Sequence, residues 1–305
     1  MSNADPTSAS SAELSDAARG PRVVALGGGH GLAASLRAAR SYAGAIAGVV
    51  SVADDGGSSG KIRRDLGLPA PGDVRRCLSA LAGNDSLLAR SLEHRFDAGD
   101  LEGHPIGNLL IAGLANATGD FEAAIAEVAR LVGAHGHLYP ATLGSVTLLA
   151  DSDSGPLRGQ VTIERATNIR NLRFEPPDPR APEAAVRAIL DADQVIIGPG
   201  SLFTSVLAVA VVPDLRAALQ ATSAQRVFVA NVANDKAELR GFDLPEHLEA
   251  LADHGIDVDV AVAHLGTRRA DRADVPVTSA DVASTDNWGH DPEKLGSVLR
   301  ALLTN

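Results

Sequence analysis

Short apolar runs alternate along the chain with segments in which apolar residues recur at helical spacing. The first such pair is the run at residues 22–26, followed by Leu32, Leu36 and Ala39 on one helical face. Further strand-like runs are found at residues 46–52, 194–197, 226–230, 258–262 and 275–277. This alternation predicts an α/β fold with a doubly wound, mainly parallel, Rossmann-like sheet.

The alternation is interrupted between residues 144 and 175. Two strand-like runs, 146–149 and 157–163, flank residues 151–155, whose sequence Asp-Ser-Asp-Ser-Gly is typical of a hairpin turn. We therefore predict an inserted β-hairpin lobe within a single α/β domain that spans residues 21–305.

Helices are predicted between the strands and at the end of the chain. Leu88, Leu92 and Phe96 recur at i, i+4 spacing and predict one helix. Asp73 follows a Pro-Gly turn and is placed to cap a helix that starts directly after it. Residues 292–303 predict a closing helix.

Three of the strand-like runs end in glycine-rich strings. These are Gly-Gly-Gly-His-Gly at residues 27–31, Asp-Asp-Gly-Gly-Ser-Ser-Gly at residues 54–60 and Gly-Pro-Gly-Ser at residues 198–201. Glycine lets the backbone approach a ligand closely, and successive N–H groups in such turns form an anion-binding nest. A strand, a glycine turn and a helix together open a mononucleotide-binding unit.

The three strings are expected to meet, because ligands in open α/β sheets bind at the carboxyl ends of the strands. We predict that Gly29, Asp54 and Gly200 line one cleft there. The adjacent carboxylates Asp54 and Asp55 point to opposite sides if the backbone stays extended, so Asp54, at the end of its strand, is expected to face the ligand. Carboxylate oxygens suit hard divalent cations, and Asp54 is therefore also a candidate magnesium ligand.

A nicotinamide-dependent oxidoreductase is a weaker alternative. The dinucleotide fingerprint Gly-x-Gly-x-x-Gly is incomplete, since Leu32 occupies the place of its last glycine. The sequence also shows no evident pairing of a nucleophile with a base. A binding role is therefore favoured over catalysis.

Charge and composition exclude some classes of binding partner. The 305 residues carry a net charge of −11 and only 3% aromatic residues, which argues against binding nucleic acid or an anionic membrane surface. Cys77, the one cysteine, excludes a disulfide framework within the chain and is expected to be a buried structural thiol. Residues 1–20 are expected to be a disordered tail. The longest apolar run, 202–212, is too short to cross a membrane, so we expect a cytoplasmic protein.

Six strings in order along the chain resemble the motifs of one family, the YvcK/CofD-like family. The strings lie at residues 27–32, 52–60, 71–75, 103–110, 138–143 and 197–205. The similarity covers nearly the whole chain after residue 21 and is greatest to the YvcK branch, whose members are often labelled gluconeogenesis factors. The sister CofD branch comprises transferases that build a deazaflavin coenzyme from a guanylyl-activated phospholactate, with a divalent metal.

The resemblance to the YvcK branch implies a regulator that binds a UDP-sugar, either UDP-GlcNAc or UDP-glucose, with magnesium as a candidate accompanying ion. It would support central carbon metabolism, cell shape and envelope synthesis. A 2-phospho-L-lactate transferase-like enzyme using the same cleft is the alternative. We expect a homo-oligomer with regulatory protein partners, although the sequence specifies neither. The residues assigned to ligand binding are Gly28, Gly29, His30, Gly31, Asp54, Asp55, Gly57, Ser58, Ser59, Asn108, Gly198, Pro199, Gly200, Ser201, Thr204 and Asn231.

Overall fold

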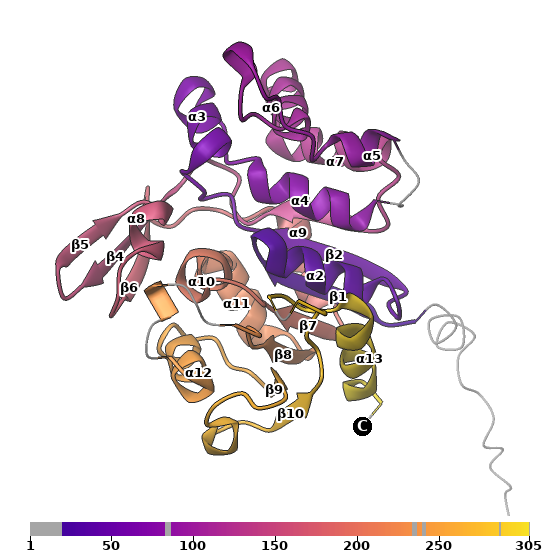
Figure 1. Ribbon diagram of the computed structural model, residues 1–305, viewed down its shortest axis with the longest axis vertical. Helices are drawn as coiled ribbons and strands as arrows, with labels where there is room; N and C mark the ends of the chain where they lie inside the picture. The colour runs from indigo at the N-terminus through magenta and orange to yellow at the C-terminus, as the bar shows by residue number, and fades with distance from the viewer. Residues whose placement is uncertain (1–19, 83–86, 234–236, 240–241, 287, 305) are drawn as a thin grey trace, which may run out of the picture.

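A seven-stranded parallel sheet forms the centre of the computed structural model (Figure 1). The structure describes residues 20–82, 87–233, 237–239, 242–286 and 288–304, so the predicted tail lies outside the described residues, apart from Gly20. The strand order is β10-β9-β8-β7-β1-β2-β3, which confirms the doubly wound α/β prediction. The strands are β1 (Arg22–Gly27), β2 (Ala45–Val50), β3 (His137–Pro140), β7 (Gln194–Ile197), β8 (Gln225–Val229), β9 (Val260–His264) and β10 (Val277–Ala280).

Helices cover both faces of this sheet. Alternate residues of the central strand β1 point to opposite faces, and both sets are apolar, so each face must be buried. Val23 and Ala25 of β1 pack in one buried apolar cluster, whereas Val24 and Leu26 pack in the other. The first cluster includes residues of α2 (Gly29–Ala39), α4 (Gly72–Leu81), α6 (Ile106–Thr118), α7 (Phe121–Leu131) and α13 (Pro292–Leu302).

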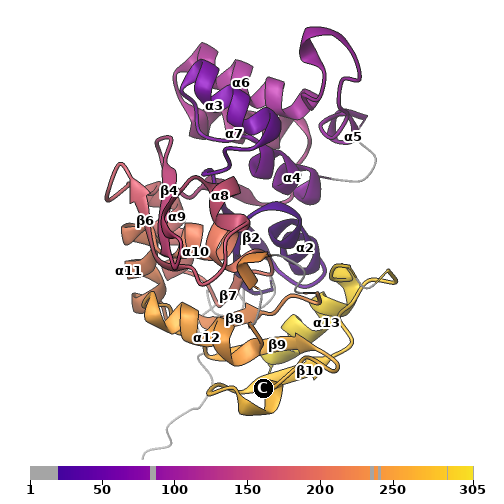
Figure 2. The same cartoon turned by 60° about the vertical axis from the view of Figure 1, so that its left-hand side comes forward.

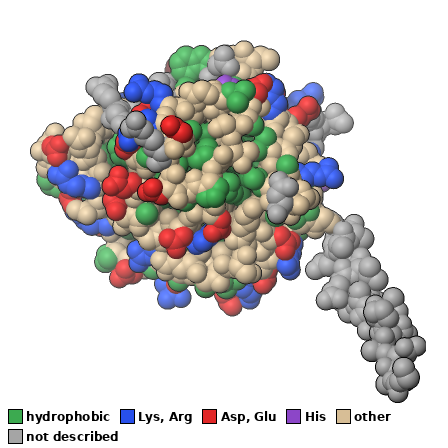
Figure 3. Space-filling view, turned by 90° about the horizontal axis from the view of Figure 1, so that it is seen from below, with side chains coloured by type: hydrophobic (Ala, Val, Ile, Leu, Met, Phe, Trp, Pro, Cys, Tyr) green, Lys and Arg blue, Asp and Glu red, His purple; other side chains and the backbone are tan. Residues whose placement is uncertain are grey.

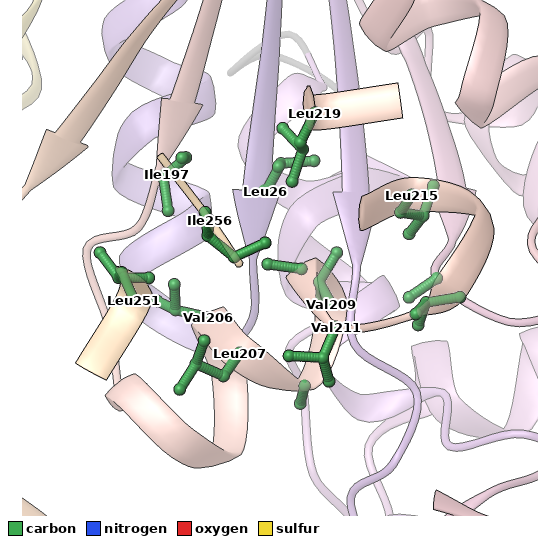
Figure 4. Packing of buried hydrophobic residues seen from close by; sticks show 14 of the residues in the cluster. Leu26, Ile197, Val206, Leu207, Val209, Val211, Leu215, Leu219, Leu251 and Ile256 are labelled. Atoms are coloured by element: carbon green, nitrogen blue, oxygen red, sulfur yellow. The ribbon is translucent and has the colours of Figure 1, made fainter. Parts of the chain in front are cut away.

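The second cluster fills the opposite face. Figure 4 shows Leu26 and Ile197 from neighbouring strands meeting aliphatic side chains of the helices that follow β7 and β8. These elements are η2 (Leu202–Val206), α10 (Leu207–Ala210), α11 (Pro213–Ala221) and α12 (Leu244–Asp253), together with α9 (Glu183–Leu190). Aliphatic residues supply most of this core, as the low aromatic content requires.

A three-stranded antiparallel sheet stands beside the main sheet (Figure 2). Strands β4 (Thr147–Ser152) and β5 (Gly155–Arg158) form the predicted hairpin, and β6 (Arg170–Glu175) pairs with the other side of β4. The prediction of a strand over residues 157–163 was wrong beyond Arg158. Gly159 has a φ of 90°, which ends the strand, and α8 (Gln160–Glu164) begins directly after it.

Two helix predictions need correction. Helix α5 covers only Leu87–Ser91, because Phe96 instead exchanges backbone hydrogen bonds with residues 103 and 104. Asp73 is not the residue that caps α4, since that helix starts at Gly72 and its N-cap residue is Pro71. The remaining helical elements are α3 (Gly57–Leu66), η1 (Gly99–Leu101), η3 (Ala237–Leu239) and η4 (Ala270–Arg272).

Over the residues described, no single helix has the length and apolar composition needed to cross a membrane. One pair, Leu202–Ala210 with Pro213–Ala221, meets that criterion jointly, by length and composition only, across a bend of 75°. On the face shown in Figure 3, acidic and basic side chains are interspersed around apolar and neutral ones.

Candidate ligand cleft

A cavity of about 450 Å³ lies at the carboxyl ends of the central strands. Gly29 follows β1, Asp54 follows β2 and Gly200 follows β7, and all three line it, which confirms the prediction that these three residues line one cleft. The lining residues are Gly28, Gly29, His30, Gly31, Ala34, Asp54, Asp73, Arg76, Gln160, Glu164, Pro199, Gly200, Ser201, Ser205, Asn231, Val232, Ala233, Trp288, Gly289 and His290.

Two backbone turns form the floor of the cleft. The turn before α2 packs so closely on the turn after β7 that a Cβ atom on Gly31 would lie 2.0 Å from the Pro199 carbonyl oxygen. Asn231, at the end of β8, fixes the second turn: its Nδ2 donates to the Gly200 carbonyl oxygen, and its Oδ1 accepts from the Gly200 N–H, each at 2.9 Å. The Asn231 side chain therefore positions the turn.

Asp73 lies against the N-terminus of α2, and the sequence interpretation of this residue as a helix cap missed that position. Its carboxylate accepts hydrogen bonds from the Gly29 N–H and, at 2.8 Å, from the Arg76 guanidinium. A Cβ atom on Gly28 would lie 2.6 Å from Asp73 Oδ2, so this approach requires glycine. Burial, together with the nearby Asp54 carboxylate, raises the pKa of Asp73 to about 6, although Arg76 opposes the shift. The Pro-Gly-Asp string was the signal available in the sequence.

The adjacent acids Asp54 and Asp55 face different surroundings, as predicted. Asp54 lines the cavity, and its Oδ1 accepts from the Gly56 N–H at 2.9 Å. Asp55 is outside the lining and accepts from the Val161 N–H at 3.0 Å, at the start of α8. Asp55 therefore anchors the start of α8, just after β5, while Asp54 faces the cavity.

Acidic groups outnumber basic ones around the cavity. Asp54, Asp73 and Glu164 line it together with one guanidinium, that of Arg76. Burial and the Arg76 charge lower the pKa of His30, so its imidazole is neutral at pH 7. An anionic ligand would therefore meet excess negative charge unless a cation accompanied it.

His290 also contributes a neutral side chain to the cavity. Burial lowers its pKa to about 4, and its Nε2–H donates to the Ala230 carbonyl oxygen at 3.0 Å. This contact holds the segment before α13 against the end of β8. His290 was not among the residues that the sequence singled out, because an isolated histidine carries no local pattern.

Several residues predicted to bind ligand lie off the cavity lining. Ser58 contacts His104 Nδ1 at 2.9 Å and accepts from Asn108 Nδ2 at 3.0 Å, which makes a separate polar cluster at the start of α3. Thr204 is buried, and its hydroxyl donates to Glu238 at 3.3 Å. The predicted residues outside the lining are Asp55, Gly57, Ser58, Ser59, Asn108, Gly198 and Thr204.

The open α/β sheet, with two glycine turns meeting over a polar cleft, defines the class of Rossmann-like α/β proteins. Residues 23–296 match the family model described as "2-phospho-L-lactate transferase CofD". A crystal structure of a UPF0052 family member from Bacillus halodurans superposes with a TM-score of 0.85 at 34% identity, and covers 91% of this chain and 98% of that one.

Similar curated proteins carry consistent names. The "Putative gluconeogenesis factor" of Mycobacterium tuberculosis is 42% identical, over 91% of this chain and 89% of that protein. The "Gluconeogenesis factor" of Halalkalibacterium halodurans is 39% identical, over 79% and 76% respectively. The chain belongs to the CofD/UPF0052 family, among relatives named as gluconeogenesis factors, and the family resemblance is confirmed.

Proposed function

We propose that this protein is a regulator that binds a UDP-sugar in the cleft and leaves it chemically unchanged. The observation that carries this proposal is the close packing of the two glycine turns over one cavity. Backbone N–H groups at a helix N-terminus favour phosphate, and a volume of about 450 Å³ suits a small organic ligand. The names of the relatives support a role in gluconeogenic metabolism, and we extend it to cell shape and envelope synthesis.

Magnesium fits this proposal for an electrostatic reason. A diphosphate would enter a cavity lined by three carboxylates and one guanidinium, so a divalent cation would offset the repulsion. Among the residues described, no group of three or more His, Cys, Asp or Glu could hold a metal alone. Mg²⁺ commonly takes one or two carboxylates and completes its shell with phosphate and water, which suits Asp54 and Asp73.

Binding without turnover is supported by the distribution of reactive groups. A Ser–His contact that the sequence did not reveal joins Ser58 to His104, and neither residue lines the cavity. The lining combines backbone turns, carboxylates, one guanidinium and two imidazoles with the hydroxyls of Ser201 and Ser205. A sensor needs only a ligand that favours one conformational state, whereas an enzyme must also stabilise a transition state.

Thermal stability and calorimetry test the proposal. The panel is UDP-GlcNAc, UDP-glucose, GDP and NAD, each with and without magnesium. We expect a saturable response to a UDP-sugar, amounting to about 2.7 kcal/mol of added stability at a ligand concentration one hundred times the Kd. A response to NAD alone, or to none of the panel, would contradict it.

A second candidate function is a transferase of the phospholactate type. It is favoured by Asp54 and Asp73 sharing the cavity and by the name of the matching family model, 2-phospho-L-lactate transferase CofD. A magnesium ion held by these carboxylates would stabilise charge on a departing phosphate. Tight GDP binding without any response to UDP-sugars would favour this function over the regulator.

A further inference from the structure

An exposed indole lies at the rim of the cleft. Trp288 is the one tryptophan of the chain, and 70% of its surface is exposed. Among the described residues that line the cavity, it is also the one Phe, Tyr or Trp side chain. The other aromatic residues described nearby, such as Phe203 and Phe228, are buried in the core.

The backbone around Trp288 is held by hydrogen bonds even though the indole is exposed. Its N–H donates to Asp286 Oδ1 at 3.1 Å, and Ser284 N–H donates to the Gly289 carbonyl oxygen at 2.9 Å. A β-bridge between Ala283 and His290 closes the segment. These contacts of the described residues on either side limit the movement of Trp288, which lowers the entropic cost of using it in binding.

The sheet order places this indole on the other side of the cleft from Asp54. Trp288 and His290 lie by the end of β8, whereas Asp54 follows β2. Strands β7 and β1 lie between β8 and β2, so three strand spacings, roughly 14 Å, separate the two sides of the cleft. The two glycine turns follow β7 and β1, in the middle.

We infer that Trp288 stacks on the nucleobase of the bound nucleotide and thereby fixes the direction in which the ligand lies. This inference rests on the proposed function. The phosphates would lie over the central glycine turns, and the sugar would lie towards Asp54. An indole offers a flat π-face to a base, whereas the acidic side suits hydroxyl groups and a cation.

The test uses Trp288→Ala and Trp288→Phe, with Leu131→Ala as a control that removes an exposed apolar side chain outside the cavity lining. Calorimetry with magnesium measures the binding of UDP-GlcNAc, UDP and inorganic pyrophosphate. We expect Trp288→Ala to weaken the binding of UDP and of UDP-GlcNAc at least tenfold, and the binding of pyrophosphate less than twofold. Trp288→Phe should stay within threefold of the wild type, and Leu131→Ala should be unchanged.

The fluorescence of the single tryptophan gives an independent readout. We expect UDP to change the emission of the wild-type protein saturably and to protect the indole from acrylamide, whereas pyrophosphate does neither. Unchanged UDP affinity in Trp288→Ala would overturn the inference while leaving the proposed function intact. An equal loss of pyrophosphate binding would also overturn it, since the segment would then have a structural role. Absence of any nucleotide binding by the wild type would overturn the proposed function itself.

Discussion

The turns after β1 and β2 are alike in sequence, but Gly31 in the first and Gly57 in the second have different surroundings. Gly31 packs on another backbone turn, and a Cβ atom there would lie 2.0 Å from the Pro199 carbonyl oxygen. Gly57 has a φ of +44° and no neighbour within 4 Å of such an atom, so it serves to turn the chain into α3. A glycine-rich string after a strand therefore predicts a helix start, but tertiary packing decides whether it becomes a ligand cradle.

The largest contrast is expected between Gly31→Ala and Gly57→Ala. The first forces two backbone turns apart, which should cost about 3 kcal/mol and abolish UDP-sugar binding. The second asks alanine to adopt a positive φ, which should cost about 1 kcal/mol and leave binding within threefold. Urea unfolding and calorimetry measure both effects. Equal losses of binding in the two variants would show that the turns do not differ in function.

The adjacent acids sharpen the same comparison, since they follow one strand and face different surroundings. Asp54→Asn should weaken magnesium-dependent UDP-sugar binding by more than thirtyfold, because a charged candidate metal ligand is lost. Asp55→Asn should change binding less than threefold, because its amide oxygen can still accept from the Val161 N–H. Calorimetry with and without magnesium distinguishes them. Wild-type affinity in Asp54→Asn with magnesium present would refute the assignment.

Each of the two turns has an aspartate on a backbone N–H: Asp73 accepts from Gly29, the first residue of α2, and Asp54 accepts from Gly56, just before α3. Of these two carboxylates, Asp73 is the buried one. Its folded-state pKa is about 6, above the ordinary 3.8. Between these pH values the folded protein keeps a proton that the unfolded chain has lost, so this group lowers stability as pH rises through the window. The full effect at pH 7 corresponds to about 3 kcal/mol.

Asp73→Asn should therefore stabilise the protein at pH 7.5 by about 1–2 kcal/mol, because it removes a buried charge while the amide oxygen still accepts from the Gly29 N–H. The gain is smaller than the full effect because the variant loses the ion pair with Arg76. The variant should also lose the fall in stability between pH 4 and 6. Urea unfolding of both proteins across this range measures the difference. Destabilisation at pH 7.5 together with an unchanged pH profile would contradict the raised pKa.

Local sequence patterns predicted the strands and turns whose formation depends on neighbouring residues. The buried runs of β1, β2 and β7 and the glycine turns after them were all predicted. The position of Asp73 was not, because a Pro-Gly-Asp string equally fits a helix cap, and only the packing of α4 on α2 brings its carboxylate to Gly29. Strand β6 was missed because its exposed residues are polar or charged and only Leu172 and Phe174 are buried.

The candidate site likewise contains residues that the sequence placed correctly and residues that it did not. Residues carried by the turns, such as Gly29 and Gly200, reach the cavity because strand ends in a parallel sheet share one edge. Asn108 and Ser58 were assigned from their motifs, but α3 and α6 meet away from the cavity lining and join these side chains to each other. Trp288 and His290 come from the far end of the chain, where the sequence holds no glycine string after a strand.

Phosphorus NMR of UDP-GlcNAc mixed with stoichiometric protein and magnesium tests the central claim most directly, because one spectrum reports both binding and turnover. We predict that both diphosphate resonances shift or broaden on adding wild-type protein, and that their summed intensity stays constant over a day. With the Gly31→Ala variant, the spectrum should be that of the free ligand, because this variant does not bind it. Unshifted resonances with the wild type would contradict binding, and growth of UMP or UDP resonances would contradict a regulator that leaves its ligand intact.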